Sequence, residues 1–182
     1  MLEEIKKVQA TAELMFSEEQ VESALDRMAA EINAVLEDRN PLVLCVLNGG
    51  IIAAGKLIPR LTMLLTIDSI NASRYQNQTS GGIIEWVLKP GTPLAGRTIL
   101  IIDDILDEGI TLAAIKDYCL EQSAEAVYCA ALIEKVLDHK KPIVADFVGL
   151  EVENRYLFGY GMDYKGYLRN ASGIYACKEE VK

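Results

Sequence analysis

The chain has 182 residues, 51% of them hydrophobic, with 18 basic against 27 acidic side chains and a formal net charge of −9. This length and apolar content suit a single domain over residues 1–182, whereas the negative charge argues against a surface for nucleic acid or anionic membranes. No apolar run approaches the roughly 18 residues of a membrane helix, and the N-terminal residues lack the pattern of a signal peptide, so we expect a cytoplasmic protein with no membrane partner.

The first half of the chain is predicted to alternate helices and strands. A capping-box sequence at 17–20 precedes apolar residues at helical spacing, which indicates an amphipathic helix. The aliphatic run 42–47 is typical of a strand that is buried on both faces. In order, the predicted elements are a helix over 18–38, a strand over 42–47, a helix up to 57, and strands over 61–70 and 83–88.

The second half continues the same alternation. Its predicted elements are strands over 99–102, 126–133, 147–150 and 156–160, with a helix over about 111–122. Strands that alternate with helices indicate an α/β fold with a mostly parallel sheet flanked by helices. The polar stretch 71–82 is a long loop for such a chain, and loops of this length more often carry function than not. It also fits an ordinary surface loop.

The cysteines and the histidine give no sign of a metal centre. Cys45, Cys119, Cys129 and Cys177 show no metal-ligand spacing, and two of them fall in apolar runs, so we predict buried, reduced thiols. The single histidine, His139, lies in a polar turn. One exposed histidine argues against both a structural zinc site and a histidine-based catalytic triad.

The strongest functional signal follows the aliphatic run 99–102. Asp103 and Asp104 are predicted to stand at the carboxyl end of this strand, which is the edge where open α/β sheets bind ligands. The loop that leads into the next helix contains Asp107, Glu108, Gly109, Ile110 and Thr111. Loop amides can hold a phosphate there, while the acids accept ribose hydroxyls or bind Mg²⁺. This pattern favours a phosphorylated sugar, although an aspartate at a strand end can also be a simple turn former or helix cap.

This string of two acids, two aliphatic residues, Asp, any residue, Gly, any residue and Thr resembles the ribosyl-pyrophosphate motif of the type I phosphoribosyltransferases. From about 12 to 175 the chain resembles in particular the hypoxanthine-guanine phosphoribosyltransferases, with four motifs in the family's order. The resemblance implies the type I fold, with a core over about 40–135 and a small hood from about 1–16 and 143–182. It also implies that 5-phosphoribosyl-1-pyrophosphate is bound by Asp103, Asp104, Asp107, Glu108, Gly109, Ile110 and Thr111.

Two further loops acquire a role through the same resemblance. Asn48 and Gly49 fall on the family's pyrophosphate loop, which contains a cis peptide that would lie at Leu47–Asn48. Bare glycine amides approach an anion closely, although two glycines here also fit a simple tight turn. The family usually has Lys at position 48, and Asn supplies no charge. The residues implied for the loop that closes over the reacting centre are Ser73, Arg74 and Tyr75.

The purine-binding end of the family falls on the last third of the chain. Lys135 would donate to the exocyclic oxygen of a 6-oxopurine, although a lone Lys at a strand end is usually only solvated. Tyr156 would stack on the base, Leu157 would meet its Watson–Crick edge through the backbone, and Met162 would line the opposite face. Asp163 would receive the exocyclic amine through its backbone. Arg169 would contact pyrophosphate, for which a guanidinium fork is well suited.

The resemblance implies an enzyme of purine salvage. It would transfer the 5-phosphoribosyl group from 5-phosphoribosyl-1-pyrophosphate to N9 of hypoxanthine or guanine, giving IMP or GMP and pyrophosphate. Asp107 would be the catalytic residue that accepts the purine N7 proton, and Glu108 would turn its carboxylate away from the phosphate. The cofactor would be Mg²⁺, held by Asp103, Asp104 and Asp163. The partners would be these two small-molecule substrates and, as is usual in the family, further copies of the chain in a dimer or tetramer.

Three alternatives remain open at this point. The enzyme could prefer xanthine, because base choice depends on a few backbone positions around 157–163. The same fold could serve a non-catalytic regulator that binds RNA or a nucleotide, although the acidic balance speaks against RNA. A different nucleotide-binding α/β protein is disfavoured, because both the dinucleotide glycine motif and the P-loop lysine motif are absent.

Overall fold

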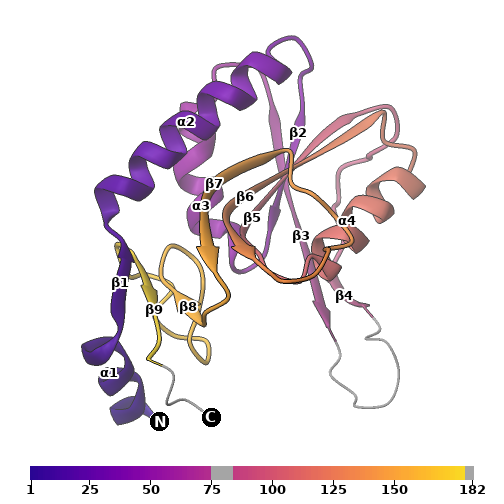
Figure 1. Ribbon diagram of the computed structural model, residues 1–182. Coiled ribbons are helices and arrows are strands. Elements are labelled where there is room, and N and C mark those ends of the chain that lie inside the picture. Colours follow the sequence, from indigo (N-terminus) through magenta and orange to yellow (C-terminus); the bar gives the residue numbers. More distant parts are fainter. Residues whose placement is uncertain (75–83, 179–182) are drawn as a thin grey trace.

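The computed structural model describes residues 1–74 and 84–178, and within them six strands form a main sheet in the order β4-β3-β2-β5-β6-β7 (Figure 1). Neighbouring strands run parallel, except that β4 is antiparallel to β3. This arrangement confirms the predicted α/β fold with a mostly parallel sheet. The strands are β2 (Leu42–Val46), β3 (Thr66–Arg74), β4 (Ile84–Leu88), β5 (Thr98–Leu106), β6 (Ala126–Val136) and β7 (Phe147–Glu153).

Helices cover both faces of the main sheet, which is why β2 and the run 99–102 of β5 are apolar. α2 (Glu18–Leu36) and α3 (Gly50–Leu57) pack on one face, and α4 (Ile110–Glu121) packs on the other. Along β2, Val43 points into the core under α2 and α3, whereas Leu44 points into the core under α4. Successive side chains of one strand thus serve two separate cores. In the described part of the chain, no helix combines the length and apolarity needed to cross a membrane.

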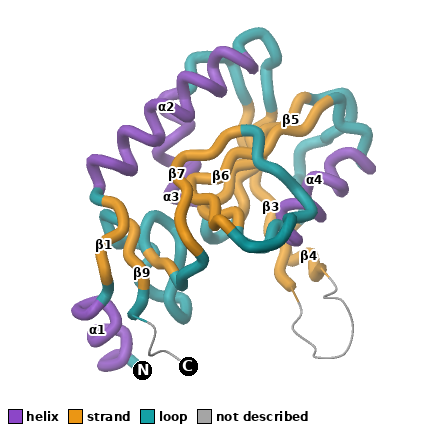
Figure 2. The backbone as a smooth tube through the Cα atoms, viewed as in Figure 1, coloured by secondary structure: helices purple, strands orange, loops and turns teal. Residues whose placement is uncertain are grey.

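A second, smaller unit, which we call the hood, combines the two ends of the described chain. It consists of α1 (Leu2–Thr11), β1 (Glu13–Phe16), β8 (Leu157–Phe158) and β9 (Ile174–Ala176). Its antiparallel strands have the order β1-β9-β8. Figure 2 shows β1 and β9, which come from opposite ends of the described chain, side by side in this unit. The hood has its own small core, which includes Ile5, Phe158 and Tyr164.

The loop between β8 and β9, residues 159–173, is called the hood loop here. Polar contacts join it to the helices that cover the main sheet. The Tyr160 hydroxyl donates a hydrogen bond to Glu22 of α2 at 2.8 Å. Glu22 also accepts hydrogen bonds from Lys56 of α3 at 2.7 Å and from Arg60 at 2.6 Å, at the end of a short 3₁₀ helix, η1 (Ile58–Arg60). These contacts, above all the one with Lys56, lower the pKa of Glu22 to about 2. One carboxylate on α2 therefore links the hood loop to α3 and η1.

Several predicted boundaries are wrong, and strand pairing explains most of the errors. The strand predicted over 61–70 begins only at Thr66, which is the first residue to pair with β2, and it continues to Arg74 because it also pairs with β4. β7 belongs to the main sheet, so the predicted start of the hood at about 143 is too early. The strand predicted over 156–160 is shorter because the chain turns at Gly159, whose φ is +102°. α1, β1 and β9 were not predicted.

Two other sequence predictions are confirmed. The capping box at the start of α2 is present, since the Ser17 hydroxyl accepts from the Gln20 amide and the Gln20 side chain accepts from the Ser17 amide. The cysteines are buried free thiols. Burial raises the pKa of the Cys119 thiol to about 11, so this group stays protonated and unreactive at neutral pH.

Candidate functional site

A cavity of about 500 Å³ opens where β2, β5 and β6 end beneath the hood loop. Carboxyl ends of parallel strands meet at one edge of a sheet, so this is the expected place for a ligand. The structure brings the predicted phosphoribosyl, pyrophosphate and purine residues together in its lining. They are Asn48, Gly49, Asp103, Asp104, Asp107, Glu108, Gly109, Ile110, Thr111, Lys135, Tyr156, Leu157, Met162, Asp163 and Arg169.

The acidic pair lies within a strand and not beyond its end, which corrects the sequence prediction. β5 continues past its aliphatic run to Leu106, because β6 pairs with it over the same length. Asp103 lies opposite Ala131 in this ladder. Backbone hydrogen bonding therefore holds the two acids in extended structure at the floor of the cavity.

The two neighbouring carboxylates are buried, and this makes their ionised forms costly. Asp103 is 9% and Asp104 6% exposed. Burial, followed by the negative charge of Asp104, raises the pKa of Asp103 well above its usual range. Burial also raises the pKa of Asp104, against the opposing effect of the Arg169 charge. A divalent cation beside such a pair would stabilise both ionised carboxylates, so the donor set fits Mg²⁺.

The acids would provide only part of a metal coordination shell. Within residues 1–74 and 84–178, no group of three or more His, Cys, Asp or Glu side chains is arranged to hold a metal ion. Mg²⁺ commonly binds through one or two carboxylates and completes its shell with water and substrate oxygens. A pair of buried carboxylates facing an open cavity agrees with that mode of binding.

The hood loop lies directly on the glycine loop that follows β2. The Leu47–Asn48 peptide is cis, as the family resemblance implies. A Cβ on Gly49 would lie 2.3 Å from Asp104 Oδ2, so only glycine fits against the carboxylate. Gly161 of the hood loop has a φ of +108°, and a Cβ there would lie 2.0 Å from the Gly49 carbonyl oxygen. The two backbones are therefore in close contact over the acidic pair.

Arg169 and Asp163 reach the cavity from the same hood loop and are bonded to each other. Arg169 Nη2 lies 2.6 Å from Asp163 Oδ1. The other Asp163 oxygen accepts a hydrogen bond from the Gly166 amide at 2.6 Å. Arg169 Nη1 also donates to the Gly161 carbonyl. The guanidinium is therefore fixed near the acids and the glycine loop, where it can receive an anion.

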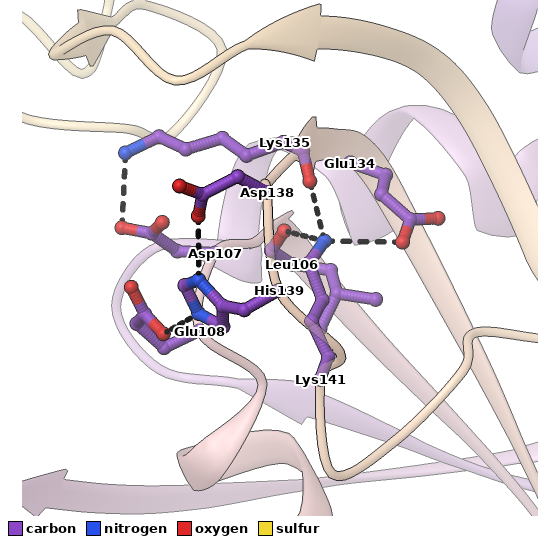
Figure 3. Close-up of polar contacts among 8 residues, drawn as sticks. All are labelled: Leu106, Asp107, Glu108, Glu134, Lys135, Asp138, His139 and Lys141. Carbon is purple, nitrogen blue, oxygen red and sulfur yellow. Dashed lines mark hydrogen bonds and ion pairs between the residues drawn. The ribbon is translucent and has the colours of Figure 1, made fainter.

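Across the cavity, Lys135 at the end of β6 forms an ion pair with Asp107, which follows β5 (Figure 3). The Lys135 ammonium lies 2.9 Å from Asp107 Oδ2. A neighbouring ammonium, that of Lys141, joins the two strand ends: it donates to the carbonyls of Leu106 at 3.1 Å and Lys135 at 2.6 Å, and to Glu134 at 3.0 Å. Lys141 therefore fixes the backbone at Lys135 and at Leu106, the residue before Asp107.

The loop between β5 and α4 has the form of an anion cradle. Gly109 has a φ of +77°, which favours glycine, and α4 begins at the next residue. The first amides of a helix have no acceptors within it, and the helix dipole favours a negative charge at this end. Glu108 directs its carboxylate to His139, with Oε2 2.9 Å from the ring Nε2. The amides of residues 107–111 are therefore the donors that this loop offers to a phosphate.

An aromatic ring flanks the cavity on the hood side. Tyr156 is 54% exposed and packs edge-on against Tyr164, with the ring centroids 5.7 Å apart. Leu157 and Met162 beside it are buried. An exposed ring edge and face next to apolar side chains suits a flat, partly apolar ligand, and aromatic stacking is the usual way to bind one.

Not every predicted residue can be placed at the site. Tyr75 lies outside the described residues. Ser73 and Arg74 belong to β3, where their backbones pair with β4. Conversely, sequence reasoning missed Lys141 and the contact between His139 and Glu108. The sequence contained a signal for these contacts. The predicted strands over 99–102 and 126–133 are neighbours in a parallel arrangement, so the connections that follow them start at the same edge of the sheet.

Comparison with known proteins agrees with this geometry. Residues 15–165 match the phosphoribosyl transferase domain. The chain is 33% identical over 169 residues to the hypoxanthine-guanine phosphoribosyltransferase of Bacillus subtilis (strain 168), covering 92% of this chain and 94% of that protein. It is 28% identical over 182 residues to the hypoxanthine-guanine-xanthine phosphoribosyltransferase of Tritrichomonas foetus, covering 100% of this chain and 96% of that protein. A solved hypoxanthine phosphoribosyltransferase of Staphylococcus aureus superimposes with a TM-score of 0.87 at 26% identity, covering 93% of this chain and 92% of that one.

Proposed function

Because this chain belongs to the phosphoribosyl transferase domain family, we propose that it transfers the 5-phosphoribosyl group of 5-phosphoribosyl-1-pyrophosphate to N9 of hypoxanthine or guanine. The products are IMP or GMP and pyrophosphate. The observation that carries the proposal is the convergence in one cavity of a buried acid pair, a helix N-terminus, a fixed guanidinium, a lysine and an exposed aromatic ring. Each group matches one part of the two substrates.

The phosphoribosyl half of the substrate pair would bind along β5 and α4. Amides of residues 107–111 would take the 5′-phosphate at the start of α4. Asn48, Gly49 and Arg169 would take the pyrophosphate, whose charge would draw Arg169 from its contact with Asp163. Mg²⁺, when bound, would neutralise charge on the leaving pyrophosphate, and the carboxylates of Asp103, Asp104 and Asp163 are the groups that would hold it.

The purine would occupy the side of the cavity next to the hood. Tyr156 would stack on the base and Lys135 would donate to its exocyclic oxygen. As the N9 lone pair forms the bond to C1′, the bond from C1′ to the pyrophosphate oxygen breaks and its electron pair leaves with pyrophosphate. Asp107 would accept the N7 proton, so that N9 becomes a better nucleophile. In this structure, Lys135 and Asp107 bind each other. The purine would replace this ion pair with two hydrogen bonds, one from Lys135 to the exocyclic oxygen and one from N7 to Asp107.

An ultraviolet assay tests this function. Protein, 5-phosphoribosyl-1-pyrophosphate and Mg²⁺ are mixed with hypoxanthine, guanine, xanthine or adenine in turn, and nucleotide formation is followed. We expect IMP or GMP to form, and formation to stop when EDTA removes the metal. Folded protein that binds 5-phosphoribosyl-1-pyrophosphate but converts no base would contradict the proposal and leave a non-catalytic regulator.

Xanthine is the second candidate base, because one of the similar proteins carries xanthine in its name. The contacts proposed for the edge of the base, at Leu157 and Asp163, are made by the backbone, so the same side chains fit either preference. Activity confined to xanthine would keep the mechanism and change the substrate. The expected cytoplasmic location and the dimer or tetramer both remain predictions.

Replacing Lys135 with alanine is expected to weaken binding of hypoxanthine and guanine selectively. A hydrogen bond from a charged donor to a carbonyl is worth about 1.5–3 kcal/mol, which corresponds to a loss of at least about tenfold. The KM values for purine and for 5-phosphoribosyl-1-pyrophosphate should be measured in parallel, and only the first should rise. Lys140→Ala is the matched control, since Lys140 is exposed and lies in the next connection. An unaltered purine KM would remove Lys135 from the site.

A further inference from the structure

The connection between β6 and β7 packs against the anion cradle through a histidine. His139 Nε2 lies 2.9 Å from Glu108 Oε2, and His139 Nδ1 lies 2.9 Å from Asp138 Oδ1 (Figure 3). Glu108 lines the cavity, whereas His139 stands behind it, in the lining of a neighbouring depression. The histidine thus holds the cradle carboxylate from the side away from the ligand.

The backbone around this contact is fixed at two points. Lys141, two residues beyond His139, is anchored to the ends of β5 and β6 by its three hydrogen bonds. Ile143 of the same connection lies so close to Gly109 that a Cβ on the glycine would come within 2.9 Å of it. The histidine is therefore held opposite Glu108 by the fold, although its own ring is half exposed.

We propose that His139 is a positioning residue for the phosphate cradle: it holds the Glu108 carboxylate away from the amides of residues 107–111 and balances its charge, so that the loop accepts the 5′-phosphate. The inference rests on the proposed function. Without this contact, the carboxylate would be free to turn over the amides and compete with the phosphate for them. An unbalanced negative charge would also repel a phosphate dianion.

The contacts of His139 with Glu108 and Asp138 indicate which protonation state of the ring holds Glu108 in place. Glu108 and Asp138 are the charged groups that face the ring, and both are acceptors only. A neutral imidazole has one N–H and can donate to one of them, whereas the imidazolium donates to both. The contacts with Asp138 and then Glu108 raise the pKa of His139 above its usual value. The charged ring is present below this pKa and is lost as the pH rises through it.

A double-mutant cycle between His139 and Glu108, read by calorimetric titration with IMP, tests the inference. His139→Gln should weaken IMP binding by about three- to tenfold at pH 6.5, the effect of one unbalanced nearby charge at partly screened distance. In the Glu108→Gln background the same change should weaken binding clearly less, because only the positive charge of the ring is lost and no carboxylate remains to be held. The KM for 5-phosphoribosyl-1-pyrophosphate should rise in His139→Gln while kcat is kept.

Measuring IMP affinity as a function of pH gives a second test. If His139 only stabilised the fold, this pH dependence would not change with Glu108. The IMP affinity of the wild type, divided by that of Glu108→Gln, should fall as the pH rises from 6 to 9, since the titrations of the ligand itself cancel in this ratio. In His139→Gln the corresponding ratio should be flat. Lys140→Gln is the matched control for a general loss of positive charge, and its effect should be the same with or without Glu108.

The outcomes separate the inference from the proposed function. Equal losses for His139→Gln in both backgrounds, or no loss in either, would overturn the positioning role alone. Failure of the wild type to bind either IMP or 5-phosphoribosyl-1-pyrophosphate would overturn the proposed function and, with it, this inference. A loss of IMP affinity that is clearly larger in the background that retains Glu108 supports it.

Discussion

Replacing Asp107 with asparagine is expected to reduce kcat by about 100-fold or more, the usual loss when a positioned proton acceptor is removed. Asparagine has nearly the same shape but cannot take the N7 proton. 5-Phosphoribosyl-1-pyrophosphate should still bind, because in the proposed binding mode the phosphate would contact the amide of residue 107 and the purine would contact its side chain. Steady-state kinetics and calorimetric titration with the Mg²⁺ complex of this substrate separate the two effects.

A control variant makes this prediction specific. Asp117→Asn removes the same charge from an exposed position on α4, and it should behave as the wild type. If turnover of Asp107→Asn is unaltered, another group accepts the proton.

Replacing Gly161 with alanine should lower the free energy of unfolding by about 2–5 kcal/mol, through backbone strain together with overpacking. The new Cβ would lie 2.0 Å from the Gly49 carbonyl oxygen, and the φ of +108° already disfavours any side chain. Neither backbone can yield easily, because Arg169 holds the Gly161 carbonyl and Gly49 is packed on Asp104. The substitution should also disturb the candidate site, since the glycine loop after β2 or the hood loop must shift to relieve the contact.

Alanine substitutions at two other glycines of the hood loop separate the cost of the left-handed backbone from the cost of overpacking. Gly166→Ala meets no atom within 4 Å at a φ of +84°, so it should show only the cost of the left-handed backbone, about 1 kcal/mol. Gly159→Ala clashes with the Gly173 carbonyl inside the hood loop and tests overpacking without contact with Gly49. Thermal unfolding and the KM for 5-phosphoribosyl-1-pyrophosphate should be measured for each. A stable Gly161→Ala enzyme with an unchanged KM would show that the contact between hood and loop does not shape the site.

The sequence predicted the main sheet well because its strands are buried on both faces. A run such as 99–102 has no polar residue, and burial of this kind is visible in composition alone. The extension of β5 through Asp103 and Asp104 was not visible, because it depends on pairing with a strand that lies far away in sequence. β1 and β9 were missed for the same reason: they are short, and each is held by the other end of the chain.

The residue types at the site were predictable, but their contacts were not. Local motifs place Asp107 and Lys135 at the ends of two strands, and parallel pairing brings those ends together. The motif could not indicate that the two side chains bind each other. Nor could it indicate that His139 reaches Glu108, because the path of the connection after β6 depends on the anchoring of Lys141. Side-chain partners that come from different loops require the assembled fold.

The composition of the hood has a consequence for the order of events during synthesis. β9 is the middle strand of the hood and the last strand in the described part of the chain, whereas β1 is the first. The main sheet can form once β7 has left the ribosome, since domains begin to fold as the chain emerges. β1 and β8 must wait for residues 174–176 before either has a partner. A nascent chain therefore acquires the acidic floor of the cavity first, and the hood above it only after residues 174–176 have emerged.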